Sequence, residues 1–314
     1  MIMPVKTRTL KAFCIIIYTV VLWSFIEGKA TIEPLSGYRN ITIVKTLEDK
    51  IVKTLGTRMW KISIDQYTQL SFLGKDGITL KYRLLKPSKI MPGQEYPLVI
   101  LLHGSNGIGN DNKGQMGFIS KQFLLPHIQE KYPCYVAAIQ FPSRSCVYTF
   151  SPKLKTRVSK PLQPMYTALE LIDQLIKNLQ TDLHRIYIAG FSMGGSTTWN
   201  ILEEKSSFFA AAVIISGVPC NRSFTHLLHT PVWMIHGTLD PITPISSSRQ
   251  LFKTLMKRNE NDIRFWEISG LGHFPPSILF ESDIFFEWLF DHSREITSVE
   301  IKNKPLIPFI ITYF

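Results

Sequence analysis

Residues 185–195 read Arg-Ile-Tyr-Ile-Ala-Gly-Phe-Ser-Met-Gly-Gly, an apolar run typical of a β-strand that ends in a serine between glycines. The stretch that follows is compatible with a helix. A serine at a sharp strand-to-helix turn is held in a strained backbone conformation, so the residues two before and two after it crowd each other. Gly190 and Gly194 relieve that crowding, and Gly195 leaves room for close helix packing. The pattern predicts a strand, turn and helix with Ser192 at the turn.

Short β-rich runs alternate with helical patterns from about residue 68 onward, which is typical of a mostly parallel sheet covered by helices on both faces. Apolar residues at helical spacing predict a helix over 166–179, and a stretch rich in Phe and Trp predicts another over 277–290. The pair Asp76-Gly77 predicts a hairpin between the first two strands, which would form an antiparallel edge of the sheet. The eight expected strands are 69–72, 78–85, 96–102, 134–139, 186–189, 211–216, 232–235 and 263–268.

Two further residues follow expected strands and suit chemistry at Ser192. A serine hydroxyl is a poor nucleophile until a base takes its proton. His273, in Gly-Leu-Gly-His-Phe after the last expected strand, is the candidate base. Asp240, in His-Gly-Thr-Leu-Asp-Pro after strand 232–235, would hold the imidazole in the tautomer that accepts the serine proton. The sequence therefore predicts a catalytic triad of Ser192, Asp240 and His273.

The segment His103-Gly-Ser-Asn-Gly107 follows expected strand 96–102. An enzyme that transfers an acyl group needs hydrogen-bond donors aimed at the developing oxyanion, and a glycine-containing turn after a strand presents backbone N–H groups there. We expect the N–H groups of Ser105 and Met193 to form this oxyanion hole. We expect His103 to have a structural role and not to serve as a second base.

These segments together resemble the α/β-hydrolase superfamily, and within it the esterase and prolyl-oligopeptidase-like serine hydrolases described as predicted peptidases or as phospholipase/carboxylesterase-like proteins. The resemblance covers roughly residues 68–292, and the order Ser, Asp, His along the chain is that of α/β-hydrolases. It implies an α/β-hydrolase fold with about eight strands and an extracytoplasmic enzyme that cleaves carboxylic esters through an acyl-enzyme intermediate. The motifs that carry it lie at residues 76–87, 96–104, 111–112, 185–195 and 231–237.

The chain departs from this group after Gly104, where relatives commonly continue with a small residue and then Gly-Glu-Arg-Gly. This sequence has Ser-Asn-Gly-Ile-Gly over residues 105–109, so substrate contacts do not carry over. By position, the pocket would be lined by residues that could equally serve packing, namely Asn106, Gln140, Trp199 and Phe274. Two other functions stay open: a serine peptidase of the same group, and a non-catalytic binding protein on this fold.

The N-terminal 30 residues have the pattern of a secretory signal peptide, with three early basic residues, an apolar stretch and the small residues Gly28 and Ala30 at its end. The apolar stretch covers 14 residues, 12–25, which is short for a membrane-spanning helix. We expect a secreted or periplasmic protein with no stable membrane span after cleavage. A retained N-terminal anchor is the weaker interpretation.

The chain has 314 residues and a formal net charge of +11, so it is not an acidic chain. With 45% of its residues hydrophobic, it can bury enough apolar surface to oppose disorder over most of its length. We expect one catalytic domain over 68–294, an N-terminal extension of unclear structure over 31–67 and a tail over 295–314. Part of the positive charge lies in a polar stretch that is typical of a solvated loop. No nucleic-acid-binding motif accompanies the basic residues of this stretch, which are Lys153, Lys155, Arg157 and Lys160.

Cysteines and other motifs add little chemistry. One disulfide and one buried thiol are expected among Cys134, Cys146 and Cys220, with the first two nearest along the chain and the connectivity open. His226 and His229 lack a third ligand, so we expect no metal site, and no nucleotide fingerprint indicates a cofactor. The expected partner is a small-molecule or polymer-borne ester. Asn40 and Asn221 begin glycosylation sequences.

Overall fold

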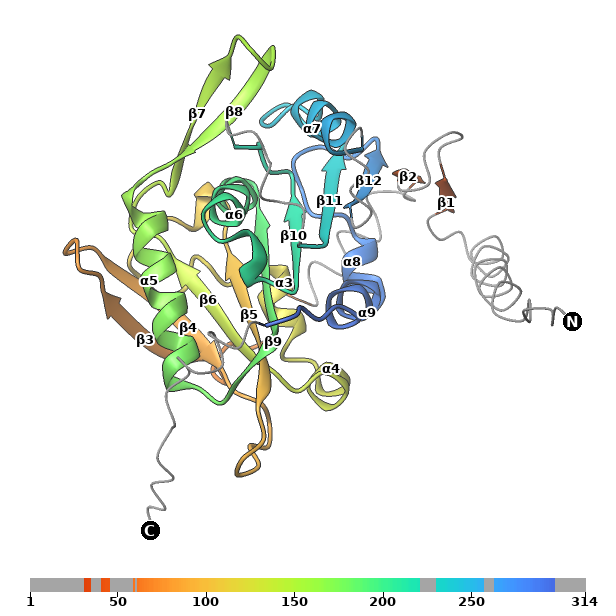
Figure 1. Ribbon diagram of the computed structural model, residues 1–314. Coiled ribbons are helices and arrows are strands. Elements are labelled where there is room, and N and C mark those ends of the chain that lie inside the picture. The colour runs from red at the N-terminus through yellow and green to blue at the C-terminus, as the bar shows by residue number, and fades with distance from the viewer. Residues whose placement is uncertain are drawn as a thin grey trace, which may run out of the picture.

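A computed structural model describes residues 31–34, 41–45, 59, 61–220, 230–256 and 263–296. Within these ranges a ten-stranded sheet has the order β1-β2-β12-β11-β10-β9-β5-β6-β4-β3, and β7 and β8 form a separate two-stranded sheet (Figure 1). The strands are β1 (Thr31–Pro34), β2 (Ile41–Lys45), β3 (Thr68–Leu73), β4 (Thr79–Leu85), β5 (Tyr96–Leu102), β6 (Tyr135–Gln140), β7 (Cys146–Ser151), β8 (Thr156–Pro161), β9 (Thr181–Phe191), β10 (Ala211–Ile215), β11 (Val232–Gly237) and β12 (Ile263–Ser269).

The central part of the sheet is parallel, as the sequence predicts. From β2 to β6 in the sheet order, every neighbouring pair of strands is parallel. The edges are antiparallel, with β1 on β2 at one side and the β3–β4 hairpin on β6 at the other. Gly77 in that hairpin has φ 82°, so the expected Asp-Gly turn and antiparallel edge are confirmed. The carboxyl ends of the parallel strands therefore share one edge.

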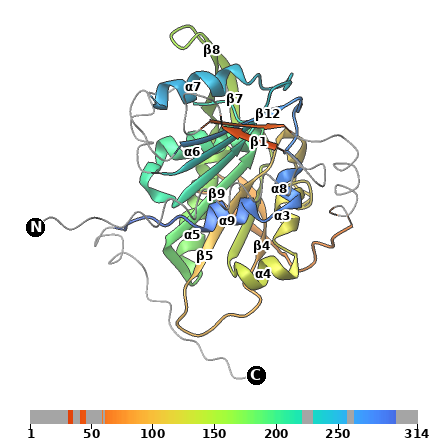
Figure 2. The ribbon, with the colours of Figure 1, turned by 90° about the vertical axis from the view of Figure 1, so that its right-hand side faces the viewer.

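Helices cover both faces of the sheet (Figure 2). One face packs against α5, α6 and α7 through side chains such as Met165, Trp199 and Phe252. The other packs against α4 and α9 through Ile128 and Phe286. The helices are α3 (Phe118–Gln122), α4 (Pro126–Lys131), α5 (Gln163–Asn178), α6 (Met193–Glu204), α7 (Ser246–Met256), α8 (Ile278–Glu281) and α9 (Ile284–Phe290), with 3₁₀ helices η1 (Ser105–Gly107) and η2 (Ser206–Phe208).

The predicted helix over 277–290 is wrong as a single element. The chain leaves α8 at Ser282, whose extended backbone has φ −144° and ψ 161°, and enters α9 after Asp283. Serine and aspartate are weaker helix formers than the leucine and glutamate residues around them, whereas the apolar pattern runs through both helices and does not reveal the break. The helix expected over 166–179 is confirmed as α5, which starts earlier, with Pro164 in its first turn.

Two segments have more structure than the sequence indicates. Part of the expected extension over 31–67 joins the sheet, because β2 pairs in parallel with β12. The basic stretch expected as a solvated loop forms the β7–β8 hairpin, in which Phe150 lies opposite Arg157. Val, Tyr, Thr and Phe are strand-forming residues, so their succession over Cys146–Ser151 was the available signal for β7.

The three described cysteines are all buried free thiols, so the expected disulfide is absent among them. Cys134 lies just before β6 and Cys146 begins β7 after it, so the whole of β6 separates them. Cys134 packs in the core on one face of the sheet and Cys146 in the core on the other face, so the two thiols do not meet.

Several expectations fall outside the described residues, namely the signal peptide over 1–30, the tail beyond 296, Asn40, Asn221, His226 and His229. Among the helices of the described ranges, none combines the length and the apolar character needed to cross a membrane.

Candidate active site

Ser192 stands at the turn between β9 and α6. Its backbone has φ 56° and ψ −115°, a left-handed conformation that is strained for a residue with a side chain. A Cβ atom on Gly190 would lie 2.3 Å from the carbonyl oxygen of Gly194, and one on Gly195 would lie 2.9 Å from that of Ile215. The predicted crowding around the turn is therefore confirmed, and only glycine fits at Gly190.

The same turn lies directly against the end of β5. A Cβ atom on Gly194 would lie 2.2 Å from the carbonyl oxygen of Leu102, so the first turn of α6 touches the β5 backbone. Ser105 begins η1 after β5, and Met193 begins α6 after β9. The N–H of the first residue of a helix has no acceptor within that helix. The structure thus brings together the two segments whose N–H groups the sequence predicts as oxyanion donors.

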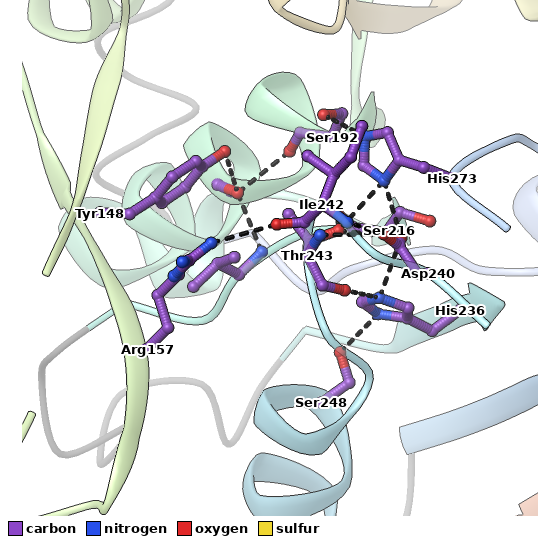
Figure 3. A network of polar contacts seen from close by, with 12 residues as sticks. Tyr148, Arg157, Ser192, Ser216, His236, Asp240, Ile242, Thr243, Ser248 and His273 are labelled. Atoms are coloured by element: carbon purple, nitrogen blue, oxygen red, sulfur yellow. Dashed lines mark hydrogen bonds and ion pairs between the residues drawn. The ribbon is translucent and has the colours of Figure 1, made fainter. Parts of the chain in front are cut away.

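His273 and Asp240 reach Ser192 from the ends of β12 and β11 (Figure 3). The Ser192 hydroxyl lies 2.7 Å from His273 Nε2 and is placed to donate to it. His273 Nδ1 lies 2.7 Å from Asp240 Oδ2 and is placed to donate to that carboxylate. The residues predicted as a triad therefore form one continuous chain of hydrogen bonds, with the imidazole tautomer that accepts a serine proton.

Gly237 allows the two loops to meet. A Cβ atom there would lie 2.3 Å from the carbonyl oxygen of Leu271 and 2.5 Å from that of Gly272. The N–H of Leu239 also donates to the carbonyl of Leu271 at 2.9 Å. The loop that carries His273 is thereby held against the loop that carries Asp240.

Asp240 has further hydrogen-bond donors, which the sequence analysis missed. Its Oδ1 accepts the N–H groups of Ile242 and Thr243 at 2.9 Å each, and its Oδ2 accepts the Thr243 hydroxyl at 2.9 Å. His236 Nε2 donates to the Thr243 carbonyl at 2.5 Å and lies 3.3 Å from Asp240 Oδ2. Aspartate often forms a turn in which its carboxylate accepts the N–H groups two and three residues later. The sequence Asp-Pro-Ile-Thr was therefore the available signal for these hydrogen bonds.

These contacts keep the Asp240 carboxylate ionised. Burial alone would raise its pKa, but hydrogen bonds from His236, His273 and the Thr243 backbone outweigh burial and hold the pKa well below its usual value. A carboxylate that stays charged at neutral pH can stabilise a cation on His273.

His103 has the structural role that the sequence predicts. It is 8% exposed; its Nδ1 donates to the Gly104 carbonyl at 2.6 Å, and its Nε2 accepts the Phe141 N–H at 2.9 Å. Burial lowers its pKa to about 4. Neutral His103 therefore joins the loop after β5 to the chain that leaves β6.

We expect the stabilisation by His103 to depend on pH. Its folded pKa of about 4 lies below the ordinary value near 6.5, so the unfolded chain is protonated first and stability falls from about pH 6.5 to about pH 4. Relative to H103Q, the wild type should lose up to about 2 kcal/mol between about pH 7 and about pH 4.5. Urea unfolding of both proteins at the two pH values measures this, and a constant difference would contradict it.

The four residues expected to line a pocket divide into two pairs. Asn106 and Phe274 are exposed next to the loop segments described above, with Phe274 67% exposed. Trp199 is fully buried in the core beneath α6, and Gln140 is 1% exposed. The Gln140 amide donates to the carbonyl of Gly107 at 3.1 Å, so it supports the loop after β5 from within. Neither Trp199 nor Gln140 reaches the surface.

A serine at a strained strand-to-helix turn, on a mostly parallel sheet with helices on both faces, defines the α/β-hydrolase fold. Residues 90–281 match the phospholipase/carboxylesterase family, and the chain belongs to that family. The family resemblance expected from the sequence is thereby confirmed.

Similar proteins are hydrolases. A crystal structure of a thermostable esterase superposes with a TM-score of 0.66 at 31% identity, over 74% of this chain and 64% of that one. An acyl-protein thioesterase 1 of Debaryomyces hansenii is 25% identical over 40% of this chain and 58% of its own length. A bifunctional acetylxylan esterase/xylanase of Neocallimastix patriciarum is 32% identical over 23% of this chain and 11% of its own length. The chain thus spans less than two thirds of each of these relatives.

Proposed function

We propose that the protein is a serine hydrolase that cleaves carboxylic esters through an acyl-enzyme intermediate. The observation that carries the proposal is the hydrogen-bonded chain from Ser192 through His273 to Asp240, with both links at 2.7 Å. The family of the chain and the esterases among its relatives support the same class of reaction.

In the first half of the reaction, Ser192 Oγ attacks the ester carbonyl while its proton passes to His273 Nε2. The ionised Asp240 stabilises the imidazolium that results. The oxyanion accepts the N–H groups of Ser105 and Met193, and losing one such donor costs about 2.7–4 kcal/mol of transition-state stabilisation. The imidazolium then protonates the departing alkoxide, which leaves as the alcohol, and the acyl group remains on Ser192.

In the second half, His273 takes a proton from water, and the oxygen of that water attacks the acyl carbonyl. The tetrahedral intermediate collapses, Ser192 regains its proton from His273, and the carboxylic acid leaves. This cycle needs no cofactor, because every proton and electron pair moves between the ester, water and side chains of the site.

A panel of nitrophenyl esters and peptide nitroanilides tests the reaction class. Amide hydrolysis requires protonation of a poorer leaving group, so we expect ester hydrolysis with a higher kcat/KM than anilide hydrolysis. Faster cleavage of the anilides would support a peptidase. Absence of hydrolysis across the panel would favour a non-catalytic binding protein.

A further inference from the structure

The hairpin formed by β7, β8 and the turn between them, here called the basic hairpin (residues 146–161), is fastened to the catalytic edge of the sheet. The Tyr148 hydroxyl lies 3.2 Å from the Ser196 hydroxyl in the first turns of α6. Arg157 donates to the carbonyl of Ile242 at 3.1 Å, two residues after Asp240 (Figure 3). The Thr156 hydroxyl lies 2.8 Å from the Ser247 hydroxyl in α7. The turn beyond Thr156 projects away from the body of the protein (Figure 1). This turn is therefore an extension of the surface that carries the site.

The basic hairpin concentrates positive charge. It carries four basic residues, and no acidic residue occurs anywhere between Lys131 and Glu170. Lys153 and Lys155 are exposed in the turn, and Arg157 and Lys160 are exposed on β8. A solvated loop would tolerate both basic and acidic residues. The absence of acidic residues therefore suggests that this surface binds a negatively charged partner.

Exposed apolar side chains share this surface. Phe150 is 68% exposed and lies directly opposite Arg157 in the hairpin register, so both side chains project from the same face. Arg157 in turn contacts the backbone of Ile242, which is 56% exposed. Leu239 and Phe274, each beside a triad residue, are 68% and 67% exposed. Among the described residues, most of the large apolar side chains that are more than half exposed therefore lie on the basic hairpin or on the loops that carry Asp240 and His273.

We propose that the basic hairpin and these apolar side chains form a docking surface for a membrane that contains anionic lipids. Lysines at the surface of such a membrane are attracted to its headgroups, and adjacent aromatic and aliphatic side chains enter the boundary with the acyl chains. The side chains of Leu239 and Ile242 have no hydrogen-bonding group, so an apolar phase suits them better than an acidic polysaccharide does. Docking in this way turns the edge that carries Ser192 toward the bilayer.

Vesicle co-sedimentation of the full chain tests this proposal, with vesicles of phosphatidylcholine alone or of phosphatidylcholine and phosphatidylglycerol. We expect binding to the anionic vesicles that weakens with salt. The double variant K153E/K155E should lower the partition coefficient about tenfold or more, and F150S about tenfold. Neither variant should change hydrolysis of a short soluble ester, which also shows that both are folded.

The matched control is K86E/K89E, which makes the same charge change in the loop between β4 and β5, at the opposite edge of the sheet. All variants share residues 1–30, so any contribution of that apolar segment is common to them. Equal loss in both double variants would contradict the proposal. Binding to polygalacturonate without binding to anionic vesicles would contradict it as well. Both results are independent of whether Ser192 is the nucleophile.

Discussion

Replacing Ser192 with alanine is expected to lower kcat for ester hydrolysis by about 10⁴–10⁶-fold. The variant keeps the N–H groups of Ser105 and Met193 but has no oxygen to form the acyl-enzyme. Alanine is smaller than serine, so the turn of β9 into α6 should still form. Steady-state kinetics with a nitrophenyl ester measure the loss, and circular dichroism with thermal unfolding shows that the variant is folded.

Ser71→Ala is the matched control for this substitution. Ser71 is exposed on the edge strand β3, on the opposite side of β5 from Asp240 and His273 in the strand order. We expect it to keep wild-type kcat. A Ser192→Ala variant that is folded and fully active would show that another group attacks the ester.

The substitution D240N is expected to lower kcat about 10⁴-fold with little change in KM. The amide NH₂ would donate to His273 Nδ1, which must then act as an acceptor. The ring proton would move to Nε2 and face Ser192 Oγ, where it prevents the imidazole from accepting the serine proton. The geometry of the loop should survive, because the amide oxygen can still accept the N–H groups of Ile242 and Thr243.

D76N is the matched control for D240N. Asp76 accepts hydrogen bonds at the β3–β4 turn, and its pKa is lowered chiefly by the Thr167 hydroxyl, so it is also an ionised and hydrogen-bonded aspartate. The β3–β4 hairpin that carries it is separated from β11 and β12 by β10, β9, β5 and β6 in the sheet order. We expect D76N to keep wild-type kcat, and an equal loss in both variants would trace the effect to stability and not to the tautomer of His273.

The sequence predicted the central strands well because each combines a buried apolar run with a turn signal. Strands buried on both faces, such as β5 and β10, are apolar throughout and stand out. Strand β2 joins the sheet by pairing with β12. The paired residues are more than 200 positions apart in the chain, and no local pattern encodes such a contact. The position of the basic hairpin likewise depends on contacts with α6 and with the loop after β11, which no local pattern encodes.

The sequence predicted those residues of the site whose positions are set by the ends of parallel strands. Ser192, Asp240 and His273 each follow a parallel strand, and parallel strands bring their carboxyl ends to one edge, so their meeting follows from topology. The direction of a side chain is a different matter. Gln140 ends β6 at that edge and Trp199 lies in α6 after Ser192, but both side chains are buried. His236 was missed because it lies within β11, where an apolar core residue is the ordinary expectation.

Labelling with a fluorophosphonate probe, followed by mass spectrometry of the proteolysed protein, tests the central claim most directly. The probe reacts covalently with an activated serine, and its oxygen occupies the same oxyanion hole as the substrate. The account predicts one modified residue, Ser192, with labelling lost in Ser192→Ala and strongly slowed in D240N. Modification of a different residue, or none in a protein that hydrolyses esters, would contradict it.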